Sequence, residues 1–381
     1  MEVFFVKVLI NSVSVKEGGA LVVQNRLLAA MSEIRPDIEW VIAAHPSSIP
    51  STMQYGVTWL QVPGLSSMGV IRWYERGLPA AIKEYGVDVL FSQTNYLPRR
   101  RLLCPSLLLI QHAGHFSSSY DQLMREFLCS PAACFFWALK RRWVHRSAEQ
   151  ATLLTVQTAA LADAISEQTA RPRGAIEVIP HGPGLAHQRK EVKNGPRPEL
   201  FRIGYVSKWG VQKNFSTLFA AAALLRTQNY QFKLVVTLDE SLRGNQRILE
   251  TARVLGVADL IENKGEVAPE CVEDLFDTLD IVVFPSLCES FGMPNVEAMA
   301  RGLPLIVAAT KENIEVTRGA ALDFPPMDAA ALAARIGTLI DNDAERTWRA
   351  ELSLEIGGQY SWRQAAEQTI RALDSLMDLR P

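Results

Sequence analysis

Short apolar runs alternate with longer amphipathic stretches along the chain. In the first half, seven apolar runs predict strands, at 3–10, 38–43, 57–62, 87–92, 107–111, 151–156 and 176–179. Segments of helical length lie between several of these runs, at 20–33, 70–85 and 158–168. This alternation is typical of βαβ units, in which helices cover both faces of a parallel sheet.

The pattern is interrupted near residue 184 and then resumes. Prolines, glycines and a charge run at 184–200 favour an inter-domain linker. Afterwards the pattern predicts strands at 201–206, 232–237, 260–262, 281–284 and 305–308, and helices at 214–226, 246–255 and 295–301. We therefore expect an α/β fold with two doubly wound, Rossmann-like domains that face each other across a cleft. The predicted parts are a first domain at 1–183, the linker, a second domain at 201–360, and a helix at 361–381 that ends the second domain or crosses back to the first.

Composition agrees with this division and excludes several classes of protein. The 381 residues, 48% apolar and 21% charged, indicate a globular chain larger than one ordinary domain. A net charge of −2 gives no general attraction to nucleic acid. The five cysteines have no metal-ligand spacing and indicate a reducing compartment. Because no signal peptide or run of ~20 apolar residues is recognisable, we expect a cytoplasmic protein, with peripheral contact at the inner face of the membrane left open.

A site with definite chemistry is predicted where the strand at 281–284 is followed by a helix. The segment Glu289-Ser-Phe-Gly-Met-Pro-Asn-Val-Glu297 places a glycine and a first-turn proline between two glutamates. A helix N-terminus at the end of a parallel strand can bind a diphosphate through backbone N–H groups. Glu297, one turn inside, can accept hydrogen bonds from ribose hydroxyls, which leaves Glu289 for a transferred sugar. The other candidate donor-binding residues of this segment are Ser290, Phe291, Gly292, Met293 and Pro294.

At these residues the chain resembles glycosyltransferase family 4 and its relatives with the GT-B fold. The resemblance rests on the two glutamates with an internal Phe-Gly, followed by Glu297-Ala-Met-Ala-Arg-Gly-Leu-Pro304. It implies a retaining transferase that moves a sugar from a nucleotide diphosphate sugar to a hydroxyl group. It also implies a glycan or lipid-linked acceptor, as in bacterial polysaccharide or lipopolysaccharide assembly.

Further donor-binding residues follow from the same resemblance. The segment that begins at Arg202 and ends in Lys213-Asn resembles the family's strand and loop that bind the donor diphosphate. Lys208 and Lys213 occupy the basic positions, although the family more often has arginine at the first. Gly18 and Gly19 follow the first predicted strand, where the family has a glycine-rich loop near the phosphates.

Two histidine positions of the first domain also match the family. His112 occupies the place of a histidine that faces the reaction centre, so it is a candidate catalytic residue together with Glu289. Ala113 stands where the family frequently has an acidic residue, and His115 is a nearby competitor for the role. His181 and Gly182 match the end of the family's first domain and are expected to line the cleft.

No motif for a metal-dependent donor site is recognisable. Asp341-Asn-Asp343 is the only Asp-x-Asp, and it lies between two helical patterns, so we interpret it as a helix-capping loop. Phosphate-binding Walker and Gly-x-Gly-x-x-Gly motifs are absent. We therefore expect no metal and no obligatory cofactor, with lysines and a helix N-terminus neutralising the leaving diphosphate.

Three alternatives stay open. The segment 127–146, from Phe127 to Arg146, combines aromatic residues with a basic cluster, which fits either a membrane-surface contact or a core helix with a solvated basic end. The protein can also be a sugar-nucleotide epimerase or an inverting GT-B transferase, and an epimerase would consume donor without acceptor. A non-catalytic, two-lobed nucleotide-sugar binder is the remaining alternative.

Overall fold

The computed structural model describes residues 6–50, 56–64, 66–128, 130–185, 187, 189, 191–192 and 197–378. Parts of four predicted segments lie outside the described residues: 3–5 of the first strand, 129 of the segment 127–146, 186, 188, 190 and 193–196 of the linker, and 379–381 of the last helix. The chain divides into two compact units. Unit 1 contains Met1–Ser117, Leu128–Gly184 and Ser361–Pro381, and unit 2 contains Ser118–Phe127 and Leu185–Tyr360.

Unit 1 is built on a parallel sheet with the strand order β3-β2-β1-β4-β5-β6-β7. Val8 in the central strand lies opposite both Trp40 and Val89 of the neighbouring strands. All three side chains are buried, as expected for a sheet that is covered on both faces. The strands are β1 (Val6–Ser12), β2 (Ile38–Ala44), β3 (Val57–Gln61), β4 (Val89–Ser92), β5 (Ser106–Leu109), β6 (Leu153–Val156) and β7 (Ile176–Val178).

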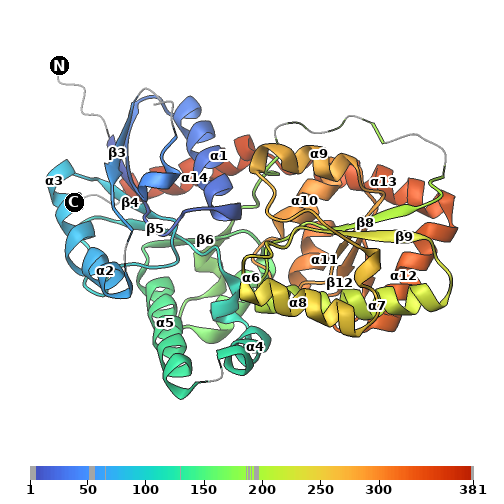
Figure 1. The fold of residues 1–381 in the computed structure, drawn as a ribbon. Coiled ribbons are helices and arrows are strands. Elements are labelled where there is room, and N and C mark those ends of the chain that lie inside the picture. Colours follow the sequence, from blue (N-terminus) through green and yellow to red (C-terminus); the bar gives the residue numbers. More distant parts are fainter. Residues whose placement is uncertain are drawn as a thin grey trace. The chain divides into compact units, whose positions relative to one another are not determined.

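Helices pack around this sheet, and one of them comes from the far end of the sequence. The helices of unit 1 are α1 (Gly18–Ile34), α2 (Ser67–Arg72), α3 (Leu78–Tyr85), α5 (Pro131–Gln150), α6 (Ala159–Gln168) and α14 (Trp362–Met377). Its short helical turns are η1 (Pro46–Ser48), η2 (Trp73–Gly77), η3 (Ala113–Phe116) and η4 (Arg173–Ala175). Helix α14 packs beside α1, and Arg35 forms an ion pair with Asp374 there (Figure 1). The predicted helix at 70–85 is interrupted by a π-helical turn, in which the Trp73 ring lies so close to Gly77 that a Cβ there would stand 2.5 Å from it.

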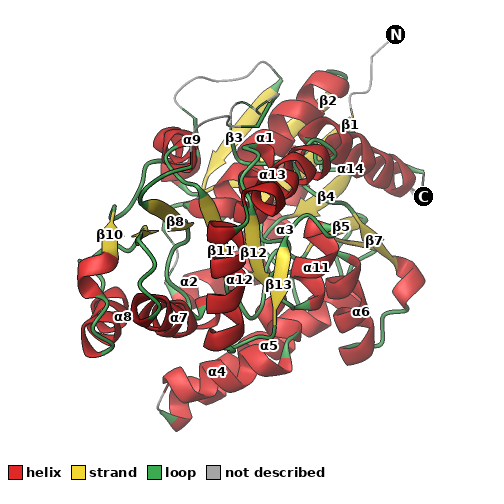
Figure 2. Ribbon diagram, turned by 90° about the vertical axis from the view of Figure 1, so that its right-hand side faces the viewer, coloured by secondary structure: helices red, strands yellow, loops and turns green. Residues whose placement is uncertain are grey.

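Unit 2 contains a second parallel sheet with the order β10-β9-β8-β11-β12-β13. Its strands are β8 (Phe201–Tyr205), β9 (Phe232–Val236), β10 (Ile261–Asn263), β11 (Ile281–Phe284), β12 (Leu305–Ala308) and β13 (Leu322–Phe324). Figure 2 shows β11, β12 and β13 side by side among the helices. The helices and turns are α4 (Ser118–Leu128), α7 (Phe215–Thr227), α8 (Arg243–Val254), α9 (Val272–Asp277), α10 (Met293–Ala300), α11 (Lys311–Thr317), α12 (Ala329–Asp341), α13 (Asp343–Gly357), η5 (Val211–Lys213), η6 (Ala258–Leu260) and η7 (Pro269–Cys271). Two parallel, helix-covered sheets confirm the predicted α/β class.

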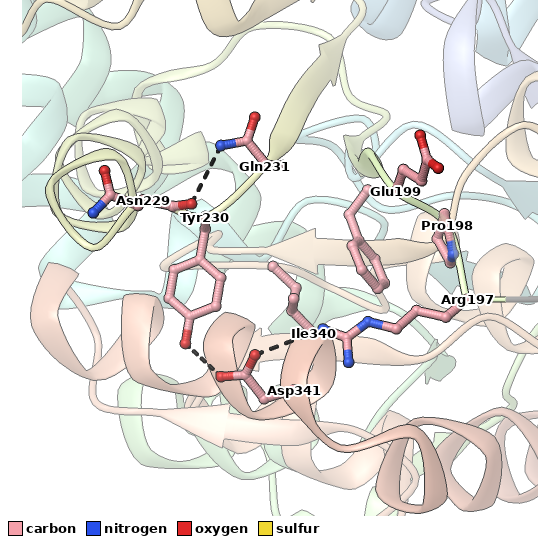
Figure 3. A pocket seen from close by; sticks show the side chains of 9 residues that line it. Arg197, Pro198, Glu199, Asn229, Tyr230, Gln231, Ile340 and Asp341 are labelled. Carbon is pink, nitrogen blue, oxygen red and sulfur yellow. Dashed lines mark hydrogen bonds and ion pairs between the residues drawn. The ribbon is translucent and has the colours of Figure 1, made fainter.

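A cavity of about 420 Å³ opens at the amino ends of β8 and β9, where Tyr230 donates a hydrogen bond of 2.6 Å from its hydroxyl to the Asp341 carboxylate (Figure 3). Asn342 caps α13 by accepting a hydrogen bond from the Glu345 N–H at 3.0 Å. This confirms the capping role predicted for the Asp-Asn-Asp segment. Across the described residues, no cluster of His, Cys, Asp and Glu is arranged to hold a metal ion. Within the same residues, no helix is long and apolar enough to cross a membrane.

Candidate active site

The segment between β11 and α10 has, at one position, a backbone conformation that favours glycine. Gly292 precedes the first residue of α10 and has a φ of +72°, in the left-handed region. A Cβ at Gly292 would also stand 2.8 Å from Nδ2 of Asn295. That amide donates to Oδ1 of Asn313 at 3.2 Å, so it has little freedom to move. The glycine therefore fixes where α10 begins.

Glu289 lies in this turn and is held by two donors, one from the turn itself and one from the loop after β8. Its Oε1 accepts hydrogen bonds of 2.6 Å from Nζ of Lys213 and of 2.6 Å from Oγ of Ser286. The side chains of Lys213 and Glu289 are each only 14% exposed. A charge pair this well shielded is stronger than a surface pair, and its geometry is set before any ligand arrives.

Lys213 reaches Glu289 because the loop after β8 is tied to the loop after β11. The Leu287 N–H donates to the Gln212 carbonyl at 2.9 Å, and Nδ2 of Asn214 donates to the Pro285 carbonyl at 3.2 Å. Asn214 takes a left-handed conformation, with a φ of 53°, which asparagine tolerates better than most residues. The Tyr205 hydroxyl donates to the Lys213 carbonyl at 2.9 Å. These hydrogen bonds fix the backbone of the loop, and the loop in turn positions the Lys213 side chain beside Glu289.

The remaining donor-site candidates of unit 2 differ in exposure. Glu297 is buried in α10, and no side chain caps the N-terminus of that helix. Phe291 is buried with its ring centroid 5.5 Å from that of Tyr360, so its side chain anchors the turn in the core of unit 2. Lys208 forms an exposed ion pair of 2.7 Å with Glu266. The structure therefore brings Lys213 to Glu289 and leaves Lys208 at the surface. Ser290 is half-buried in the turn, as are Met293 and Pro294 at the start of α10.

The charge of Glu289 also acts on groups that the sequence did not single out. Burial raises the pKa of Glu312, and the charges of Glu289 and Glu315 raise it further. Burial likewise raises the pKa of Tyr205, with a second contribution from Glu289. Ser286 lies in the motif region and was identifiable as a polar residue after a strand. Glu312 follows a different strand, and no spacing in the sequence pointed to it.

In unit 1, the two glycines predicted near phosphate begin α1. Gly18 has a φ of +67°, whereas Gly19 has an ordinary backbone. A Cβ at either position would meet nothing within 4 Å. The preceding residue, Glu17, makes no side-chain hydrogen bond that caps the helix. The amino end of α1 is therefore an open surface at the end of a parallel strand.

His112 and His115 occupy different environments. Nδ1 of His112 accepts a hydrogen bond of 3.1 Å from the Gly114 N–H, so in its neutral form the proton is on Nε2. His115 is buried and stacks on Trp137, with ring centroids 5.0 Å apart. Burial, followed by the neighbouring His112, lowers the pKa of His115 to about 2. His115 is therefore a neutral core residue, and His112 is the half-exposed one of the pair.

His181 and Gly182 pack against α14. The His181 ring is buried, with its centroid 5.2 Å from that of Trp362, and burial lowers its pKa to about 3. A Cβ at Gly182 would stand 2.7 Å from the backbone nitrogen of Trp362. Nε1 of Trp362 donates to the Pro183 carbonyl at 2.6 Å. These contacts give both residues a structural role in fixing the C-terminal helix to unit 1.

Comparison with known proteins adds to this geometry. A family model described as glycosyl transferases group 1 matches residues 187–351, which include Lys208, Lys213 and the segment from Glu289 to Glu297. The chain is 28% identical over 260 residues to an MMP alpha-(1->4)-mannosyltransferase of Mycolicibacterium hassiacum. That match covers 63% of this chain and 60% of the relative, so the chain spans less than two thirds of its length.

Solved structures share the whole fold. Sucrose-phosphate synthase of Thermosynechococcus elongatus is similar with a TM-score of 0.78 and 17% identity, over 98% of this chain and 100% of that one. Anabaena HepE in complex with UDP-glucose is similar with a TM-score of 0.70 and 18% identity, over 97% and 99%. At these identities the likeness shows the GT-B fold. Residues 187–351 of this chain thus resemble the glycosyl transferases group 1 family, on a fold that the whole chain shares with these structures.

Proposed function

We propose that this protein is a retaining glycosyltransferase that transfers a sugar from a nucleotide diphosphate sugar to a hydroxyl group of a glycan or lipid-linked acceptor. The observation that supports it best is the shielded pair of Lys213 and Glu289 beside the uncapped N-terminus of α10. A cation, a carboxylate and a helix N-terminus at the carboxyl ends of parallel strands suit a diphosphate joined to a hydroxylated ring.

Each residue has a role in this proposal. Glu297 binds the ribose hydroxyls, and Lys213 shifts from Glu289 to the diphosphate when the donor enters, with Lys208 leaving its surface partner to assist. Glu289 then accepts hydrogen bonds from the transferred sugar. His112 lies at the reaction centre, where its Nε2–H can donate to a sugar oxygen. The departing phosphate acts as the base for the acceptor hydroxyl, so the protein supplies charge and orientation rather than a nucleophile.

The hypothesis that the protein binds a nucleotide diphosphate sugar is tested by thermal unfolding with nucleoside diphosphates and their hexose conjugates. The ligands include UDP with UDP-glucose, and GDP with GDP-mannose. A ligand at 100 times its Kd stabilises the folded state by about 2.7 kcal/mol, which is readily seen as a rise in Tm. Lys213→Ala should weaken binding about 10- to 100-fold, because a charge-assisted contact to phosphate is lost. If no nucleotide raises the Tm of the wild type, the proposal is wrong.

Turnover separates the remaining alternatives. An epimerase would convert the bound nucleotide sugar without acceptor. A non-catalytic binder would show no turnover, so Glu289→Gln would have no rate to lower. A transferase releases nucleoside diphosphate faster when a suitable hydroxylated acceptor is added, and the product anomer distinguishes retention from inversion.

We also propose that α5 contacts a membrane surface where the acceptor is lipid-linked. Phe135 is 60% exposed and Phe136 is 68% exposed, and Arg142 and Arg146 on the same helix are exposed as well. Exposed rings next to cations suit an anionic lipid interface. Co-sedimentation with phosphatidylglycerol vesicles should exceed that with phosphatidylcholine, and Phe135→Ser with Phe136→Ser should lower binding to the phosphatidylglycerol vesicles. Equal sedimentation of wild type and variant would contradict this contact.

A further inference from the structure

Both donors of Glu289 bind the same carboxylate oxygen. Nζ of Lys213 and Oγ of Ser286 each lie 2.6 Å from Oε1. No residue that the structure describes donates a hydrogen bond to Oε2, and this oxygen keeps some access to solvent in a side chain that is 14% exposed. One oxygen of the carboxylate is thus occupied by the protein, and the other is open to a ligand.

Ser286 donates its single hydroxyl proton to Glu289. The carboxylate oxygen is 2.6 Å from Oγ, whereas the Gln212 carbonyl oxygen is 3.4 Å from it. A hydroxyl has one proton to donate, and a short bond to a charged acceptor is stronger than a long bond to a neutral one. Ser286 has an exposed fraction of 0%, so water does not compete for this bond and the hydroxyl is out of reach of a ligand.

The position of Ser286 is fixed from the neighbouring strand. Nδ2 of Asn313 donates to the Ala308 carbonyl at the end of β12, at 3.0 Å, and to the Ser286 carbonyl at 3.4 Å. Asn313 is itself buried in the first turn of α11, where its backbone N–H donates to Oγ1 of the capping Thr310 at 3.3 Å. Ser286 is therefore held by β12 and α11 in the absence of any ligand.

We propose that Ser286 is a positioning residue that holds Oε1 of Glu289 after Lys213 has moved to the diphosphate, so that Oε2 stays directed at the transferred sugar. The inference rests on the proposed function, which assigns Lys213 to the diphosphate and Glu289 to the sugar. When the lysine leaves, the carboxylate loses one of its two donors, and its side-chain torsions would become free without the second. A carboxylate that is fixed in advance costs less entropy to order when the sugar binds.

The test compares calorimetric binding of nucleoside diphosphates and of their hexose conjugates to the full chain, with UDP and UDP-glucose as one pair and GDP and GDP-mannose as the other. Ser286→Ala removes one hydroxyl. It should weaken binding of the sugar conjugate about three- to tenfold and leave that of the matching diphosphate unchanged. Ser353→Ala is the matched control, because Ser353 is also buried and its hydroxyl finds no partner within the described parts of the chain. It should change neither affinity.

A second comparison shows whether Ser286 acts through Glu289. In a Glu289→Ala background, Ser286→Ala should cause no further loss of affinity for the sugar conjugate, because no carboxylate remains to be positioned. A loss that is confined to the conjugate and absent from this background supports the inference. It is overturned if Ser286→Ala keeps the wild-type ratio of the two affinities, or if its effect persists without Glu289. If the wild type binds no member of the panel, or Glu289→Ala binds the conjugate as tightly as the wild type does, the proposed function fails and the inference falls with it.

Discussion

The pair of Lys213 and Glu289 should contribute measurably to stability in the absence of any ligand. Both side chains are 14% exposed, and Glu289 also accepts a hydrogen bond from Ser286. Removing one member of a fully buried pair costs about 3–5 kcal/mol, and partial solvent screening reduces that here to about 2 kcal/mol. We therefore expect Lys213→Met to lower the free energy of unfolding by about 2 kcal/mol, since it leaves a shielded carboxylate with one donor fewer.

A double-mutant cycle isolates the interaction between the two charges. Lys213→Met, Glu289→Gln and the double variant are unfolded in urea, and the coupling energy should be about 1–2 kcal/mol. The pair of Lys208 and Glu266 is the control, because its distance is also close to 2.7 Å but its side chains are 53% and 57% exposed. Its coupling should be below about 1 kcal/mol. Equal coupling energies for the two pairs would refute the argument from burial.

Three further predictions concern the backbone at Gly292, the packing of Trp362 and the buried His181. Gly292→Ala should lower stability by about 1–3 kcal/mol in thermal unfolding, because it needs a left-handed φ and meets Asn295, whereas Gly174→Ala, with open space and no such φ, should not. Trp362→Ala should lower the free energy of unfolding in urea by about 2 kcal/mol through lost packing of α14, and the far-UV circular-dichroism spectrum of the folded protein should be retained. The pKa of His181 is lowered to about 3, so its unfolded form binds a proton below about pH 6.5 while the folded form does not. Stability should fall with decreasing pH by about 1.4 kcal/mol per unit for this residue, and His181→Asn should remove that slope between pH 6 and 4. An unchanged slope in the variant would contradict the assignment.

Apolar patterning predicted those strands that are long and continuous. The runs at 38–43 and 281–284 coincide with β2 and β11 to within one residue. Strand β13 was missed because it has three residues, with the exposed Asp323 in the middle and Pro325 directly after it. The helix at 70–85 was predicted as continuous, because a π-helical turn stabilised by the packing of Trp73 on Gly77 leaves no periodic signal. Local patterns record burial, and these two features depend on particular tertiary contacts.

The candidate site was recognisable only where chemistry lies within one segment. The two glutamates and Gly292 are close in sequence, so their strand-turn-helix context could be predicted. The role of Lys213 came from the family resemblance, since the contact to Glu289 joins residues that are 76 positions apart. The assignments of substrate contacts to these residues remain predictions.

The return of α14 to unit 1 has a consequence for how the protein is made. During synthesis, domains that are contiguous in sequence can fold as they leave the ribosome. Residues 185–360 are complete before 361–378 appear, whereas α1 must wait for them to obtain its partner helix. The unit that starts first therefore finishes last, and its apolar α1 face stays uncovered while the rest is translated. If translation is slowed after residue 360 and before residues 361–378 are made, the protein should depend more on chaperones, and its mature fold should not change.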